Sequence, residues 1–182
     1  MALDIDRVPT AGTWWRQVAS GLDPLRLREP RTDGRWQRGE VTGAVYLAAD
    51  RETVWAEWYR ALAERALPAR VWLPCELWRL TVELEQVADL SDERRLRRLG
   101  LELPLRDRRT WPVYQEVGET VFAEGYAGLI APSAARPEGL VLCVFERDGG
   151  LPGLTADEGP EVVADPPTPP RGPRTSEPSS RR

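Results

Sequence analysis

The chain has 182 residues, 41% of them hydrophobic, which is enough for one domain with a buried core. All 25 basic residues are arginine and no histidine is present. This excludes histidine-based catalysis, most zinc sites, Schiff-base chemistry and a P-loop lysine. The net charge of −4 argues against direct nucleic-acid binding. We see neither a signal peptide nor a membrane span in the sequence, and expect a soluble cytoplasmic protein.

The first half of the chain mixes strands with one helix. In chain order, the pattern predicts a strand over 14–19, a long polar loop over 22–43, a strand over 44–48 and a helix over 51–66. Asp50 is expected to cap this helix, and Pro68 to follow its end. Its apolar stripe consists of Val54, Trp55, Trp58 and Leu62.

The second half continues with further strands and two helices. The pattern predicts a strand over 71–84, a helix over 92–99 capped by Ser91, a helix from Pro112 to Glu124, and strands over 129–130 and 140–145. No regular strand–helix–strand rhythm is present, so we expect an α+β fold with mixed strands packed against a few helices. The core is expected to contain Trp14, Trp55, Trp58, Trp72 and Trp78.

Two features concern the ends of this organisation. Residues 149–182 are rich in proline, glycine and serine and lack apolar periodicity, which predicts a disordered tail after a single domain over 1–148. Cys75 and Cys143 each lie in an apolar, strand-like stretch. Two thiols are too few for a metal cluster or a disulfide scaffold, so we expect both to be buried and reduced, and no metal site.

Four segments combine polar residues with turns or strand ends. They are Trp15-Arg16, the turn Asp33-Gly34-Arg35-Trp36-Gln37, the stretch Val45 to Glu57 with Tyr46 near its start, and the turn Gly128 to Arg136 with Ser133 in it. In this order they resemble the RES domain family over roughly Trp14 to Arg147. The family turn has glycine at Asp33 and asparagine at Gln37. Asp tolerates left-handed backbone well, whereas the longer amide of Gln37 leaves its contact open.

The resemblance implies a fold like that of ADP-ribosyltransferases and a toxin of a bacterial toxin–antitoxin pair. It also implies NAD as the substrate, with no cofactor, and cleavage at the nicotinamide–ribose bond by a glycohydrolase or phosphorylase. The implied partner is an Xre-type helix-turn-helix antitoxin that blocks the NAD pocket. The alternatives are a protein ADP-ribosyltransferase and a catalytically silent RES-like binding module. An arginine-rich RNA-binding domain is disfavoured by the acidic balance.

The resemblance assigns the phosphate-binding and aromatic roles to three residues. Arg35 would clamp the pyrophosphate with its planar guanidinium, although a loop arginine is more often simply solvated. Arg16 would bind phosphate as well, or would stack on a neighbouring tryptophan. Tyr46 would lie against the nicotinamide, although a tyrosine in such a strand usually belongs to the core.

Two further residues complete the predicted site. Glu57 lies on the flank of its helix, where a carboxylate usually meets solvent, and the resemblance places it in the active site as the group that stabilises a cationic ribose. Ser133 has no histidine to activate it, so hydrogen bonding to a phosphate or a ribose hydroxyl is expected rather than nucleophilic attack. We therefore predict Glu57, Arg35 and Ser133 as catalytic, and Arg16, Arg35, Tyr46 and Ser133 as NAD-binding.

Overall fold

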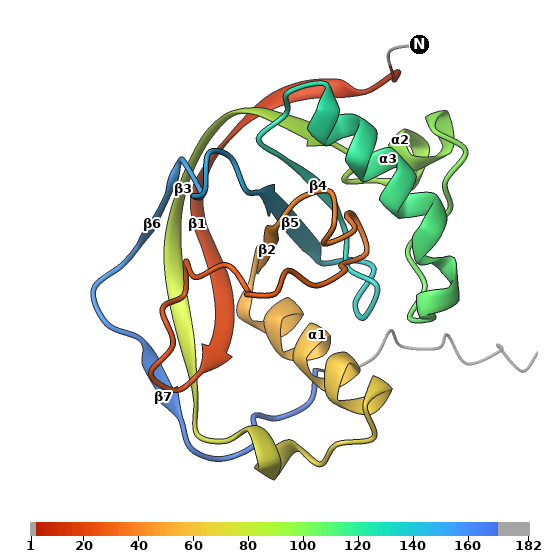
Figure 1. Cartoon of the computed structure of the whole chain (residues 1–182). Helices are drawn as coiled ribbons and strands as arrows, with labels where there is room; N and C mark the ends of the chain where they lie inside the picture. Colours follow the sequence, from red (N-terminus) through yellow and green to blue (C-terminus); the bar gives the residue numbers. More distant parts are fainter. Residues whose placement is uncertain (1–2, 171–182) are drawn as a thin grey trace, which may run out of the picture.

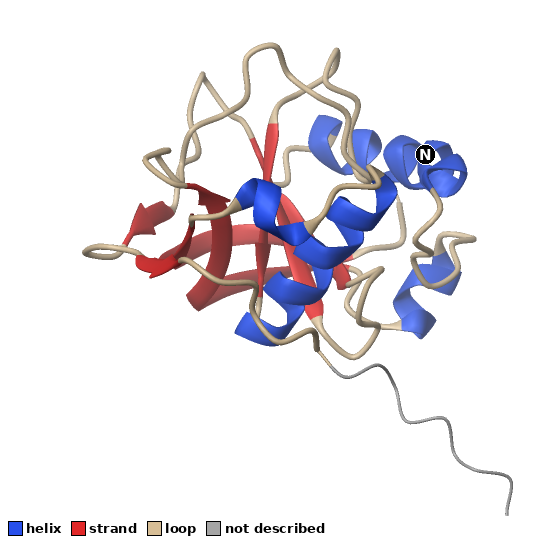
Figure 2. Ribbon diagram, turned by 90° about the horizontal axis from the view of Figure 1, so that it is seen from below, coloured by secondary structure: helices blue, strands red, loops and turns tan. Residues whose placement is uncertain are grey.

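The structure is a computed structural model that describes residues 3–170 (Figure 1). The elements within that range are β1 (Asp6–Ala19), β2 (Ala44–Ala48), α1 (Arg51–Glu64), η1 (Ala69–Trp72), β3 (Cys75–Asp89), α2 (Glu93–Arg98), η2 (Arg108–Thr110), α3 (Trp111–Ala123), β4 (Gly128–Pro132), β5 (Leu140–Phe145), β6 (Leu154–Ala156) and β7 (Glu161–Val163). In Figure 1, α1 lies below the central strands while α2 and α3 lie at the upper right, and strands and helices occur together in one fold in both views, so the predicted α+β class is confirmed (Figures 1 and 2).

Five strands pair in a closed ring. β1 pairs antiparallel with β3 along nearly its whole length, from Asp6 opposite Asp89 to Ala19 opposite Cys75. On its other side β1 pairs with β2 through Trp15 and Ala48. From β2 the ring continues through β5 to β4, and both pairings are antiparallel. β4 closes the ring by pairing parallel with the end of β3, at residues 87–89. The interior of this ring is apolar, and it holds Trp14, Val45, Leu47, Leu80, Val82, Leu142 and Val144.

The short central strands agree with the sequence, whereas the long ones do not. β2 and β5 have the predicted bounds because both are almost wholly apolar and buried. β1 begins at Asp6 instead of residue 14, and β3 runs to Asp89 instead of residue 84. The extra residues of these two strands pair with each other. Residues 71–72, which were predicted to start the strand, belong to η1 instead.

The helices are fixed by caps and by close backbone contacts. The Asp50 carboxylate accepts a hydrogen bond from the Thr53 amide at 2.8 Å, as predicted for α1. The α2 cap is Asp92 and not Ser91, since the Asp92 carboxylate accepts from the Arg95 amide at 2.9 Å. On α3, any Cβ at Gly118 would overlap the Trp36 carbonyl oxygen. Only glycine there lets α3 press against the turn that carries Arg35.

The segment after residue 148 differs from the predicted disordered tail. β6 pairs with β3 opposite 80–82, and β7 pairs with β3 opposite 75–77. Further along, the Tyr59 hydroxyl on α1 donates to the Pro167 carbonyl at 2.5 Å. The prediction of disorder, and the domain boundary at 148, are therefore wrong for residues 149–170. The predicted tail over 171–182 lies outside the described residues.

The predicted core is largely confirmed. Trp14, Trp55 and Trp58 are buried, as are both free cysteines. Trp72 is 38% exposed in η1, so its assignment to the core is wrong. Over residues 3–170, no helix has the length and apolar character required to cross a membrane.

Candidate active site

A cavity of about 650 Å³ opens between α1, β2 and the loop over 22–43. Its charged lining is dominated by arginine: Arg16, Arg26, Arg28, Arg31, Arg35, Arg60, Arg65 and Arg108. Only three acidic residues share this lining, namely Asp33, Glu57 and Glu64. The cavity is large enough for a ligand of dinucleotide size and strongly favours an anionic one.

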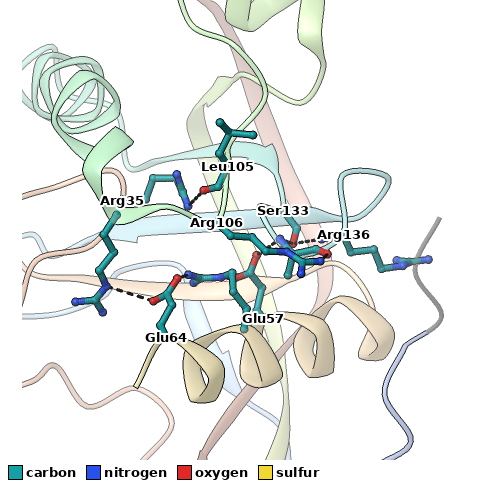
Figure 3. A network of polar contacts seen from close by, with 10 residues as sticks. Arg35, Glu57, Glu64, Leu105, Arg106, Ser133 and Arg136 are labelled. Atoms are coloured by element: carbon teal, nitrogen blue, oxygen red, sulfur yellow. Dashed lines mark hydrogen bonds and ion pairs between the residues drawn. The ribbon is translucent and has the colours of Figure 1, made fainter. Parts of the chain in front are cut away.

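Glu57 lies in the cavity wall with both carboxylate oxygens engaged. Oε1 accepts hydrogen bonds from the Ser133 hydroxyl at 2.5 Å and from the Ala135 amide at 3.2 Å, and Oε2 lies 2.7 Å from Arg60 Nε (Figure 3). Burial raises the pKa of Glu57, but Arg60 and then the Ser133 hydroxyl more than offset it, so the pKa is lowered. Glu57 is therefore an ionised carboxylate held in one orientation.

Ser133 supports Glu57 and does not line the cavity. Its side chain is fully buried in the turn after β4. Besides donating to Glu57, its hydroxyl accepts hydrogen bonds from the Ala135 and Arg136 amides, each at 3.1 Å. The sequence predicts that the Ser133 hydroxyl contacts a ligand, whereas in the structure it donates to the Glu57 carboxylate.

Arg35 projects from its loop toward the cavity and is largely buried. Nη2 donates to the Leu105 carbonyl at 2.5 Å (Figure 3). Nη1 is buried and has no hydrogen-bond partner among residues 3–170. Burial and then the nearby Arg60 lower the pKa of Arg35, while Glu57 opposes them. An arginine remains charged under these conditions, so Arg35 presents a buried cation with a donor to spare.

The turn that carries Arg35 is held by its neighbours. The Gln115 amide on α3 donates to the Gly34 carbonyl at 2.9 Å. Asp33 accepts from the Gly39 amide at 2.9 Å without a left-handed backbone. The Gln37 amide donates to the Thr32 carbonyl at 3.1 Å and accepts from the Tyr46 hydroxyl at 2.6 Å. Both departures from the family turn thus make contacts that stabilise it.

Tyr46 lines the cavity, and its hydroxyl is committed to the Arg35 turn. Besides donating to Gln37, the hydroxyl accepts from the Trp36 amide at 3.1 Å. Burial raises the pKa of Tyr46 well above its usual value, so the hydroxyl stays protonated. The ring, more than the hydroxyl, is therefore the part of Tyr46 that remains for a ligand.

Arg16 lines the same cavity from β1. It hydrogen-bonds the Pro24 carbonyl, which joins the strand to the start of the long loop. Burial, and after it the nearby Arg28, lower the pKa of Arg16 to about 10. Arg16 is thus a cation at neutral pH, and the cavity contains all of the predicted site residues except Ser133.

Arg60, Glu64 and Arg108 also line the cavity, although the sequence did not predict them as site residues. Arg60 pairs with Glu57 three residues before it and with Glu64 four residues after it, and the Arg108 Nε lies 3.2 Å from Glu64 Oε2. The spacing of Glu57, Arg60 and Glu64 is visible in the sequence, but on a helix such a spacing usually marks a solvent-exposed face. Within residues 3–170, no group of three histidine, cysteine, aspartate or glutamate residues could hold a metal ion.

This geometry can be set beside known proteins. The family model of the RES domain matches residues 7–160, which includes β6. A similar fold occurs in the crystal structure of the M. tuberculosis MbcT-MbcA toxin-antitoxin complex, with 23% sequence identity, 87% coverage of each chain and a TM-score of 0.68. No curated protein matches the chain. Because the family model covers most of its length, the protein belongs to the RES domain family.

Proposed function

We propose that this protein cleaves the nicotinamide–ribose bond of NAD and acts as the toxin of a toxin–antitoxin pair. The observation that carries the proposal is an ionised carboxylate, Glu57, held in the wall of a cavity lined by eight arginines. Such a cavity attracts a pyrophosphate and offers one anionic group beside it. A single carboxylate beside bound phosphates suits the cleavage of a glycosidic bond whose leaving group needs no acid.

The cleavage step follows from charge. As the bond between nicotinamide and ribose breaks, its electron pair moves to the pyridinium nitrogen, and nicotinamide leaves neutral without an acid. Positive charge develops on the ribose, where the Glu57 carboxylate stabilises it. Water or inorganic phosphate then attacks the ribose carbon and gives up a proton to solvent. NAD is the substrate, and no cofactor or metal takes part.

The arginines and Tyr46 position the substrate. Arg35 has a buried Nη1 with no partner among residues 3–170, which suits one oxygen of the pyrophosphate. Arg16 supplies a second cation to the cavity from β1. The Tyr46 ring provides an apolar surface for the nicotinamide. Fixing the pyrophosphate at these points brings the glycosidic bond against Glu57, so that positioning contributes much of the rate.

Ser133 acts on Glu57 in this mechanism. Its buried hydroxyl donates to Oε1 at 2.5 Å, so it orients the carboxylate and favours the ionised form. This replaces the contact with a phosphate or ribose hydroxyl that the sequence analysis assigned to it.

The alternatives share the site and differ in outcome. A protein ADP-ribosyltransferase would break the same bond and pass the ribose to a side chain of another protein. The alternative of a catalytically silent binding module is based on Asp33 and Gln37, which differ from the residues of the family turn. Both side chains hydrogen-bond within the turn and leave Arg35 and Glu57 in the cavity, which favours an active enzyme.

The partner follows from the toxin–antitoxin complex in which a similar fold occurs. We propose an antitoxin that covers the mouth of the cavity, of the Xre helix-turn-helix type implied by the sequence resemblance. DNA contacts would then belong to the antitoxin. With such a partner and NAD as substrate, we propose that the protein acts in the cytoplasm.

The test is an incubation of the purified protein with NAD, with and without inorganic phosphate. We expect free nicotinamide in both reactions. ADP-ribose should form without phosphate, and phosphorylated ADP-ribose should form with phosphate if phosphate is an acceptor. Calorimetry on Glu57→Gln measures NAD binding separately from turnover. Neither binding nor consumption by the parent protein would contradict the proposal.

A further inference from the structure

Arg60 occupies an unusual place on α1, between the predicted catalytic carboxylate and a second acid. Its Nε lies 2.7 Å from Glu57 Oε2, and its Nη1 pairs with Glu64 Oε1. The side chain is only 16% exposed although it lines the cavity. A charged group this buried is costly unless it is paired, and Arg60 has two anionic partners.

Glu64 is itself held from the far side. Arg108, from η2, places Nε 3.2 Å from Glu64 Oε2, and Glu64 projects from α1 in the same direction as Glu57 (Figure 3). The four side chains therefore alternate in charge along the cavity wall. This alternation ties the carboxylate of Glu57 through Arg60 to a second segment of the fold.

The contacts of Glu57 divide between its two oxygens. Oε1 faces the Ser133 turn, and Oε2 faces Arg60. The hydrogen bonds from Ser133 and Ala135 fix only Oε1, so on their own they would leave the position of Oε2 free. The ion pair with Arg60 fixes Oε2 as well, so the whole carboxylate is held in one orientation.

We propose that Arg60 is a positioning residue, anchored by Glu64, that holds the Glu57 carboxylate toward the ribose of the bound dinucleotide. The inference rests on the proposed function, because Glu57 is catalytic only there. In this arrangement Arg60 Nε and Nη1 are engaged by the two glutamates, so we assign the pyrophosphate to the other arginines of the cavity.

The electrostatics agree with the geometry. Among the groups that lower the pKa of Glu57, Arg60 has the largest effect, followed by the hydrogen bonds from Ser133 and Ala135. Burial raises this pKa and is the largest single cause. Arg35, from the loop, lines the same cavity, and Glu57 raises its pKa. Removing Arg60 thus leaves burial opposed mainly by the hydrogen bonds from Ser133 and Ala135.

The experiment uses the full chain and begins without NAD. The ¹³C carboxyl resonance of Glu57, assigned by its loss in Glu57→Gln, is titrated in the parent, in Arg60→Met and in Arg60→Lys. We expect the carboxyl to titrate at higher pH in Arg60→Met and closer to the parent in Arg60→Lys. Arg97→Met is the matched control, since Arg97 pairs with Glu93 at the exposed surface of α2 and should change nothing.

Kinetics then test the link to turnover. A rise of about one unit in the pKa of Glu57 corresponds to about 1.4 kcal/mol and should make kcat of Arg60→Met fall up to about threefold further than that of the parent between about pH 8 and about pH 5. KM for NAD should stay within about twofold, because Arg60 is not a ligand of NAD. Arg60→Lys should recover most of the loss.

The outcomes separate the two proposals. An unchanged Glu57 titration in Arg60→Met overturns the role of Arg60 whatever the protein does with NAD. A raised KM with an unaltered pH profile overturns it too, since Arg60 would then be an NAD ligand. A parent that ignores NAD refutes the proposed function, while the titration still decides how Arg60 acts on Glu57. If Arg60→Met does not fold, Glu64→Gln, which removes the anchor of Arg60, is titrated instead: Glu57 should titrate at higher pH there, and an unchanged titration overturns the role of Arg60.

Discussion

Replacing Glu57 by glutamine removes a charge and almost nothing else. The side-chain oxygen of glutamine can still accept from the Ser133 hydroxyl and the Ala135 amide, and glutamine is as good a helix former as glutamate. What is lost is the ion pair with Arg60, whose side chains are 24% and 16% exposed. A partly buried pair of this kind contributes about 1 kcal/mol to stability, so the fold should survive.

The kcat of Glu57→Gln should fall sharply. At an effective dielectric constant of about 20, a carboxylate about 4 Å from a full positive charge is worth about 4 kcal/mol. The ribose carries part of such a charge in the transition state, so the loss is about 3 kcal/mol, or about a hundredfold in kcat. Binding of NAD should change much less, because the interaction strengthens only as the bond breaks.

The assay is release of nicotinamide by the purified variants, with calorimetry for NAD affinity. Glu52→Gln is the matched control, since Glu52 lies in the first turn of the same helix, is 71% exposed at its side chain and pairs with Arg136 outside the cavity. It should retain the parental rate. Parental turnover by Glu57→Gln would refute the mechanism.

Three other perturbations test the rest of the site and the fold. Arg35→Lys should raise KM for NAD about tenfold with an unchanged thermal melt, because lysine lacks the planar fork, and unaltered kinetics would return Arg35 to a structural role. Ser133→Ala should lower kcat more than it raises KM, since it loosens Glu57, and should cost about 1 kcal/mol of stability in chemical denaturation because the Arg136 amide loses its acceptor while the Ala135 amide keeps Glu57; a change in KM alone would argue for direct substrate contact. Removing residues 149–182 should lower the melting temperature by about 5 °C or more because β6 and β7 are lost, whereas removing 171–182 should not, and equal melts would contradict the pairing with β3.

Local pattern determined the elements whose stability is local or fully apolar. α1 and its Asp50 cap follow from side chains within one turn of each other, and β2 and β5 follow from nearly unbroken apolar runs. The four motif segments predicted the site residues in the same way, and the structure gathers Glu57, Arg35, Arg16 and Tyr46 around one cavity.

Tertiary structure decided the elements and contacts whose partners are distant in sequence. The start of β1 contains proline and glycine, and β6 and β7 lie in a proline-rich stretch, so none has an intrinsic strand pattern. They are strands because β3 offers unpaired backbone groups along both edges, and a backbone hydrogen bond does not depend on side-chain periodicity.

The orientation of the site residues was likewise beyond the sequence. A serine in a turn and an arginine one helical turn from a glutamate both read as ordinary local stabilisation. Ser133 meets Glu57 only because β4 brings its turn against α1, across 76 residues of chain, whereas Arg60 reaches the other carboxylate oxygen from within α1. The sequence alone therefore determined which residues could serve the chemistry, and three-dimensional packing decided which of them touch the ligand space and which hold Glu57, because burial and charge pairing depend on neighbours that the sequence does not place.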